Sequence, residues 1–300
     1  MRKSGERKVS ISGARSELGY VLRHLSPRRG SGSVHINVAA QQANTLLHDG
    51  HAWDEFGRAA LAATRGAIRA ARTGGATLLV HASFAFVHAV EHGAALEPPL
   101  RSCVDAILEC EALALSAPLP ACVVRLGYLY GPHSADLCAY RTAFGLGRPY
   151  WSGPAEARQY HLHQLDAASA LLAAAKSRAA GKIYYATDGR AVSFLQFMDG
   201  FAHRVGRPKP SHLPPYSQPL ARLIIRKEHM QQTALAMPLR APSPRVPGWK
   251  PKFADYRRGL DQVIERELAE IDQAAPVAAL AEVIDVAREG LLVRRADTER

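Results

Sequence analysis

The sequence predicts an α/β fold: a doubly wound parallel sheet of reduced strand number, about five strands, with a small carboxyl-terminal lobe. A strand-like segment at residues 8–12 runs through a glycine-containing turn into a helical pattern. Short, nearly continuous apolar runs at residues 76–83 and 121–126 are typical of strands buried in a parallel sheet. Helical patterns alternate with these runs, as they do in strand-helix-strand units. These three observations together predict the fold class.

The elements of the first half follow from the spacing of apolar residues and from the positions of turn residues. A break rich in Pro, Gly and Ser at residues 27–33 separates the first helix from the second strand. Gly74 and Gly75 end the second helix. The predicted order is strand 8–12, turn 13–19, helix 20–25, strand 34–41, helix 53–72, strand 76–83, helix 104–116 and strand 121–126.

The second half has a different pattern, with a proline-rich loop at residues 208–219. We predict a helix that ends near residue 177, a strand at residues 182–186 and a helix at residues 193–205 that Ser193 caps. Near the end of the chain, one helix face either packs on its own domain or pairs with a second subunit in a homodimer. The residues of that face are Val277, Leu280, Val283, Ile284 and Ala287.

Composition limits the function classes. Of the 300 residues 47% are hydrophobic and 22% charged, and no apolar run is long enough to span a bilayer, so we expect no membrane partner. The amino terminus lacks the long apolar core of a signal peptide, which favours a cytoplasmic location. The four cysteines have no metal-ligand spacing, so we expect reduced thiols and no metal site. They are Cys103, Cys110, Cys122 and Cys138.

The formal net charge of +11 raises the question of a nucleic-acid partner. Basic residues are densest between Arg222 and Arg258, yet over the whole chain they are scattered among acids. Charge runs usually lie on solvated faces, so an exposed surface is favoured over phosphate or nucleic-acid binding in this segment.

Several motifs in succession resemble those of one family. Residues 125–132, RLGYLYGP, are similar to the RPGxxYGP signature of the extended short-chain dehydrogenase/reductases, the NAD-dependent epimerase/dehydratase family. Residues 9–19 resemble its (V/I)TGxxGxxG turn, and residues 34–41 its DxVxHLAAQ strand. Further similarities, in family order, extend to about residue 266. The resemblance implies a Rossmann-like fold, NAD or NADP as cofactor and a small molecule or nucleotide sugar as ligand.

The resemblance also implies a division of the chain and a deletion. The Rossmann-like domain would comprise residues 1–140 plus 161–187, the substrate lobe residues 141–160 plus 188–266, and a helical tail residues 267–300. Residues 34–41 resemble the family's fourth strand but follow the first helix after about nine residues, too few for a strand-helix-strand unit of roughly thirty. We therefore expect the family's second and third strands to be missing, which leaves the adenosine subsite without half of its wall.

Glycines in the first turn imply the cofactor site, because such turns bring backbone N–H groups and a helix N-terminus to a pyrophosphate. Gly13 and Gly19 match the first and last family glycines, and Ser16 replaces the middle one. Arg15 either contacts a ribose 2′-phosphate, which would favour NADP, or is a surface residue. The resemblance places Ala39 and Ser83 beside the cofactor as well.

The family's catalytic Ser/Thr, Tyr and Lys have no counterparts here. Aligned on the family motifs, their positions hold Phe84, Leu100 and Val104, so the usual proton relay cannot form there. A catalytically impaired protein that acts as a ligand-binding or regulatory subunit is therefore the leading hypothesis. The rival is an active NAD(P)-dependent oxidoreductase, epimerase or dehydratase in which His81 or His88 replaces the tyrosine.

Two further positions suggest the substrate side. Tyr128 lies within the signature, and Arg158 lies near the family arginine that holds the diphosphate of a nucleotide sugar, although a surface salt bridge is the alternative role. His163 and Asp166 resemble the family's HxxD pair, which is chiefly structural and joins the two lobes.

Overall fold

The structure is a computed structural model that describes residues 8–26, 33–41, 50–96, 98–132, 134–177, 180–207, 209–221, 223, 230 and 243–274. Five parallel strands form its main sheet in the order β1-β2-β3-β4-β8. Their bounds are β1 Lys8–Ser12, β2 Ser33–Asn37, β3 Leu78–Phe84, β4 Ala121–Leu126 and β8 Ile183–Ala186. The predicted fold class and the four strands named above for the first half are thus confirmed.

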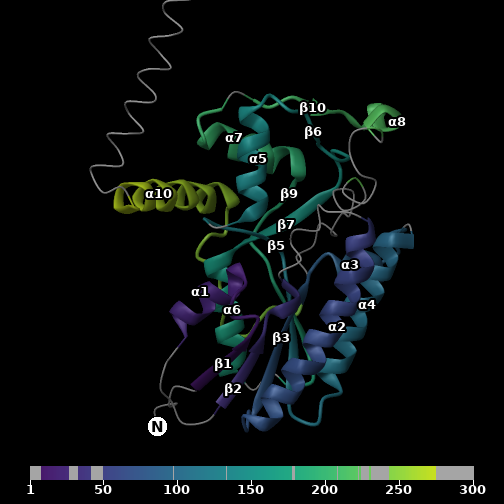
Figure 1. Cartoon of the computed structure of the whole chain (residues 1–300), viewed down its shortest axis with the longest axis vertical. Helices are drawn as coiled ribbons and strands as arrows, with labels where there is room; N and C mark the ends of the chain where they lie inside the picture. Colours follow the sequence, from purple (N-terminus) through teal and green to yellow (C-terminus); the bar gives the residue numbers. More distant parts are fainter. Residues whose placement is uncertain are drawn as a thin grey trace, which may run out of the picture.

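Helices cover both faces of this sheet (Figure 1). On one side α1 packs along α6, and on the other α2 packs along α4, with α3 beside them. Their bounds are α1 Glu17–Leu25, α2 Gly50–Thr73, α3 Val87–Glu91, α4 Pro98–Leu115 and α6 Gln164–Lys176. Aliphatic residues from the strands, α1 and α6 form the largest core cluster.

The first strand lies at the edge of the sheet among the described residues, directly beside β2. This confirms that segment 34–41 pairs with β1. Ser10 and Ser12 on β1 each place a hydroxyl 2.8 Å from one ring nitrogen of His35 on β2. These side-chain contacts add to the backbone ladder and help to hold an edge strand that has a neighbour on one side only.

Two predicted boundaries are corrected. The second strand ends at Asn37, four residues early, because a turn closed by the bond from Gln41 N–H to the Val38 carbonyl follows it. Helix α4 begins at Pro98, six residues before the predicted start, because proline is well accommodated in the first turn of a helix, where its missing N–H costs no hydrogen bond.

A smaller lobe lies beyond the carboxyl ends of the sheet strands (Figure 1). Its sheets are β5-β7-β9 and β6-β10, and its core is rich in aromatic residues. The bounds are β5 Tyr128–Tyr130, α5 Ala135–Gly145, β6 Tyr150–Trp151, β7 Arg158–His163, β9 Ala191–Ser193, α7 Phe194–Arg204, β10 His212–Leu213, η2 Pro215–Ser217, α8 Gln218–Ala221 and α10 Tyr256–Ala274. The Ser193 cap of α7 is confirmed, with Gln196 completing a capping box.

Helix α10 begins at Tyr256, eleven residues before the helical tail predicted for residues 267–300, and the helix face expected at residues 277–287 lies outside the described residues. So does about half of the basic segment, of which residues 222, 224–229 and 231–242 are not described. None of the helices in the described part of the chain is long and apolar enough to cross a membrane.

Candidate functional site

The turn between β1 and α1 keeps two glycines for steric reasons. Gly13 has a φ of +82°, and a Cβ there would stand 2.6 Å from the backbone nitrogen of Ala39. A Cβ on Gly19 would collide with the carbonyl oxygen of Gly13. Both positions therefore require glycine, the first for a tight turn against β2 and the last for the close approach of α1 to the turn. This cradle fits the pyrophosphate of a dinucleotide.

Ser16, at the middle glycine position, uses its hydroxyl inside the turn. The Oγ atom donates to the Gly13 carbonyl at 2.7 Å and accepts from the Gly19 N–H at 3.0 Å, which makes Ser16 the N-cap of α1. Its side chain is buried, whereas Arg15 beside it is exposed. The hydroxyl thus stabilises the helix start and the turn, and the neighbouring guanidinium is accessible to a ligand.

Ala39 follows the carboxyl end of β2 and packs against the glycine turn. Its N–H donates to Asn37 Oδ1 at 3.1 Å, and the Asn37 amide nitrogen lies 3.0 Å from Nδ1 of His81. Because β1 is an edge strand, the side of the turn away from Ala39 has no neighbouring strand among the described residues. This edge position agrees with the short segment between α1 and β2, and the missing wall of the adenosine subsite stays a prediction.

The three relay positions lie in one apolar cluster. Phe84 at the end of β3 is 5% exposed, and Leu100 and Val104 on α4 are fully buried. Cys103 and Ile107, one turn along the same helix face, belong to the cluster too. A shift of the family alignment by one helical turn therefore brings no acid or base to this place.

The two histidines considered as substitutes lie in different environments. His81 is buried in the middle of β3, where burial lowers its pKa to about 4 and keeps it neutral. His88 on α3 is half-buried, and its Nδ1 lies 3.0 Å from the hydroxyl of Tyr185 on β8. Burial first, and then the neighbouring His92, lowers the pKa of His88. The structure thus brings His88, but not His81, to a second titratable group.

Arg125 on β4 holds a buried ionic cluster that sequence reasoning missed. Its guanidinium donates to both carboxylate oxygens of Glu91, to both of Glu111 and, at 2.8 Å, to the hydroxyl of Tyr185. Ser83, predicted beside the cofactor, donates its hydroxyl to Glu111. The backbone register places Ser83, Arg125 and Tyr185 side by side on the neighbouring strands β3, β4 and β8. Knowledge of this strand pairing would have been needed to find the cluster from the sequence. We call these residues, with Glu91 and Glu111, the arginine cluster.

Tyr128, predicted at the substrate side, donates its hydroxyl to Asp136 at 3.0 Å. Burial raises the pKa of Asp136 to about 7, with Glu17 adding a smaller effect. Glu17 accepts from the N–H of Ala135 and from the side chain of Gln164, so it ties α1 to the lobe. Arg158 is exposed at the start of β7, away from these buried contacts.

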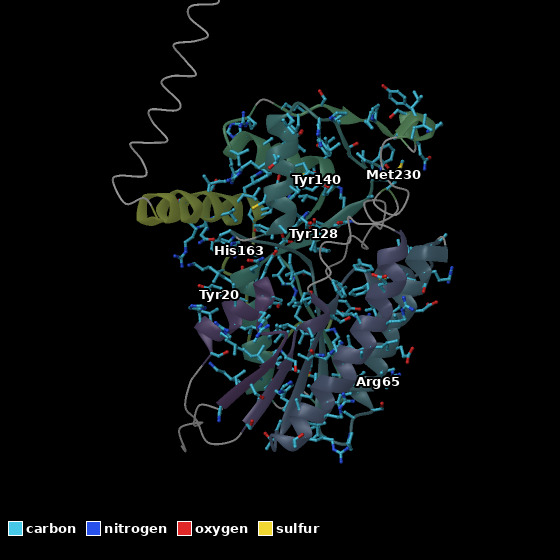
Figure 2. The ribbon with its side chains drawn as sticks, viewed as in Figure 1. Tyr20, Arg65, Tyr128, Tyr140, His163 and Met230 are labelled. Atoms are coloured by element: carbon cyan, nitrogen blue, oxygen red, sulfur yellow. The ribbon has the colours of Figure 1, made fainter. Side chains whose placement is uncertain are left out.

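Asp166 joins the two parts of the molecule. Its carboxylate accepts from the N–H groups of Lys252 and Phe253 at 2.7 and 2.8 Å. His163 accepts the N–H of Leu165 at Nδ1 and caps α6. Both contacts agree with the structural, lobe-joining role expected of the pair. Figure 2 shows His163 and Tyr128 at the level where the lobe meets the sheet.

Comparison with known sequences gives one informative relative. No family model matches the chain. The chain is 30% identical over 256 residues to the 3-diazoavenalumate denitrifying reductase of a Streptomyces species, and the match covers 80% of this chain and 82% of the reductase.

Solved structures with low sequence identity have the same fold. RMD from Pseudomonas aeruginosa, complexed with NADPH, matches 88% of this chain and 99% of its own at a TM-score of 0.61 and 14% identity. The human epimerase family protein SDR39U1 with NADPH matches 86% and 99% at 0.63 and 15%. The UDP-glucose 4-epimerase of Thermotoga maritima with UDP-glucose matches 88% and 99% at 0.59 and 12%.

Proposed function

The chain belongs to the extended short-chain dehydrogenase/reductase family, of the NAD-dependent epimerase/dehydratase type, and from this premise we propose that it is an NAD(P)H-dependent reductase whose hydride acceptor needs no proton. The observation that carries the proposal is the apolar cluster of Phe84, Leu100 and Val104, found in a chain that retains the glycine turn.

The chemistry of hydride acceptors explains how an apolar cluster at the relay positions is compatible with a retained cofactor turn. Hydride addition to a carbonyl leaves an alkoxide that must gain a proton, and removal of hydride from an alcohol requires a base, which is the task of the family's tyrosine. An acceptor that already carries a positive charge becomes neutral when it receives hydride. With such an acceptor, leucine and valine at the relay positions do not lower the rate of hydride transfer. They also exclude water from the reacting atoms.

The named substrate of the Streptomyces relative is such an acceptor in its diazonium form. Reduced nicotinamide, when bound, supplies a hydride. A carbon–hydrogen bond forms with the hydride electron pair, and the carbon–nitrogen bond breaks with its pair leaving on dinitrogen. The arenediazonium cation and hydride thus give a neutral arene and N₂, and no proton enters or leaves. We propose an arenediazonium, and not a nucleotide sugar, as the substrate class.

Gly13, Ser16 and Gly19 would hold the pyrophosphate, and Ala39 would line the cofactor beside them. Arg15, exposed next to the turn, supports a preference for NADPH through the 2′-phosphate of the cofactor. A second candidate is a ligand-binding subunit without turnover, which the place of β1 at the sheet edge among the described residues supports, since the adenosine subsite would then lack part of its wall. In that case binding of the dinucleotide would be weak and would lead to no product.

The test uses purified protein, a carboxylated arenediazonium salt and NADPH deuterated at C4 of the nicotinamide. We expect deuterium in the arene product, one N₂ released per NADPH oxidised, and no turnover with UDP-glucose. Arg15→Ala should weaken NADPH binding by about tenfold while NADH binding stays unchanged, because one charge-assisted contact is lost. Arg23→Ala, an exposed arginine on α1 outside the turn, is the matched control.

Saturable dinucleotide binding without deuterium transfer would contradict the reductase and support the binding subunit. Turnover of UDP-glucose that disappears in Tyr185→Phe or His88→Ala would favour the rival, an epimerase with a substituted acid.

A further inference from the structure

An apolar groove lies between α1, the start of α6 and α10. It is a hollow of about 330 Å³, and its lining includes Tyr20, Val21, Leu25, Pro132 and Leu165. Tyr20 and Leu25 are 49% and 45% exposed, although α1 already packs Leu18 and Leu22 into the main core. Helix α1 thus has apolar side chains on a second face that are about half exposed to solvent. We propose that residues 277–287 of this chain, which lie outside the described residues, dock in this groove as a helix.

The segment offers a face that matches the groove. Its apolar side, at helical spacing, consists of Val277, Leu280, Val283, Ile284 and Ala287. Glu282, Asp285 and Glu289 fall on the opposite side. An amphipathic helix of this kind binds by laying its apolar side into a hydrophobic groove, while its acidic side stays in water.

The connection between α10 and the segment favours a helical hairpin. Helix α10 ends at Ala274, and Pro276 follows two residues later. A proline lacks the N–H that would continue α10, and it disfavours the helical conformation of the residue before it. In the first turn of a new helix the missing N–H costs nothing. Residues 275–276 thus form a link of two residues, within the usual length for two antiparallel helices.

The length of α10 brings such a hairpin back to the groove. Gln262 and Arg266, one turn apart on α10, line the groove, and Ala274 lies about 12 Å beyond Arg266 along the helix axis. A helix of residues 277–287 is about 16 Å long, so on its return beside α10 it passes the level of Arg266. Figure 1 shows α10 above α1, with its far end projecting beyond the lobe and the sheet. The segment would fill the space beside both helices.

Charge and chain connection both favour the chain's own segment as the occupant. Arg266 and His24 at the rim are exposed, and the groove lining in the described part of the chain includes no aspartate or glutamate. Residues 277–289 contain three acids and one arginine, so the field at the rim favours their approach. A short link also gives the segment a higher effective concentration at the groove than a second copy of the chain can reach.

The experiment compares the rates at which N-ethylmaleimide alkylates two variants of the full chain, Ala287→Cys on the apolar side and Ala278→Cys on the opposite side. Both carry Cys138→Ser, because Cys138 is exposed and the other native cysteines are buried. Each rate is divided by the rate in denaturing urea, which removes differences in intrinsic thiol reactivity. We expect the Ala287→Cys thiol to react at least about tenfold more slowly, since the reagent reaches it only when the segment leaves the groove.

Two charge substitutions locate the docking surface. Leu25→Asp in the groove and Leu280→Asp in the segment should each raise the rate at Ala287→Cys to that at Ala278→Cys, because each places a carboxylate in the apolar contact. Leu146→Asp is the matched control and should leave the rate unchanged, since Leu146 is 62% exposed and does not line the groove.

Equal rates for the two cysteine variants, or equal effects of Leu25→Asp and Leu146→Asp, would overturn the proposal. So would protection of Ala287→Cys that increases with protein concentration, together with a dimer mass in light scattering, because a second copy would then occupy the groove. The contact involves neither the glycine turn nor the relay positions, so its test does not depend on reductase activity.

Discussion

Two regions of this molecule differ sharply in the polarity of their buried side chains. The cluster of Phe84, Leu100 and Val104, the positions that the motif alignment assigns to the family's proton relay, consists of hydrophobic side chains and the buried thiol of Cys103. On the same side of the sheet, the arginine cluster buries a guanidinium with two carboxylates, a hydroxyl and a phenol. The first region can move no proton, and the second has its polar groups bonded to one another. Under the proposed function, the hydride acceptor requires no proton from either region.

The largest effect is expected from restoring one relay residue, in Val104→Lys. The position is fully buried in an apolar cluster, so the ammonium must either lose its proton or open the core. A shift of 3–5 units in the pKa of a buried lysine corresponds to a loss of about 4–5 kcal/mol in the free energy of unfolding at pH 7, because the loss stops growing once the folded pKa falls below the pH. Urea denaturation at pH 7 measures it.

Val104→Met is the control, with a cost of about 1–3 kcal/mol for overpacking. A Val104→Lys protein as stable as the Met variant would mean that water reaches position 104. The contrast between the apolar cluster and the arginine cluster would then be wrong.

The next effect comes from breaking the arginine cluster with Glu111→Ala. Glu111 is buried and accepts from Arg125 and Ser83, so its removal leaves a buried guanidinium with a partner on one side only. We expect a loss of about 3–5 kcal/mol in the free energy of unfolding. Glu91→Ala, at a side chain that is 37% exposed, should cost clearly less, because water can replace its carboxylate. Equal losses in the two variants would refute this difference.

His81 provides a pH-dependent prediction. Its pKa in the folded state is about 4, below the ordinary 6.5, so its neutral form stabilises the fold above pH 6.5 and this contribution is lost as the pH falls toward 4. Asp136 and Asp188 have raised pKa values, about 7 and 8, and contribute with the opposite sign. A comparison of variants therefore isolates the histidine.

Wild type and His81→Gln should differ in the pH dependence of the free energy of unfolding by about 1.4 kcal/mol per pH unit between pH 6 and 4.5. His24→Gln, at an exposed position, should leave the slope unchanged. Parallel slopes for wild type and His81→Gln would mean that His81 is accessible to protons in the folded state.

More of the fold than of the candidate site could be predicted from the sequence. The strand order was predictable because a glycine turn and three apolar runs are local signals, and the short segment before β2 left no space for another strand. That Phe84, Leu100 and Val104 share one apolar cluster follows from residue types that the sequence already shows, whereas their assignment to the family's relay stays a prediction. The arginine cluster was not predictable, since Ser83, Arg125 and Tyr185 are far apart in sequence and meet only through the register of three strands. Asp136 was missed for a similar reason, because its altered pKa comes from burial in the folded chain.

The smallest effect, and the one that most sharpens the comparison, is expected from Tyr185→Phe. The phenol stands between Arg125 Nη1 at 2.8 Å and His88 Nδ1 at 3.0 Å, so the variant removes two hydrogen bonds but leaves the guanidinium paired with both carboxylates. We expect a loss of about 1–2 kcal/mol in stability, measured by urea denaturation, and an unchanged rate of arenediazonium reduction. Tyr184→Phe, at the neighbouring buried tyrosine in the main core cluster, is the matched control. If turnover falls tenfold or more in Tyr185→Phe and not in Tyr184→Phe, the phenol acts on the substrate, and the arginine cluster has taken over the proton transfer that the apolar cluster gave up.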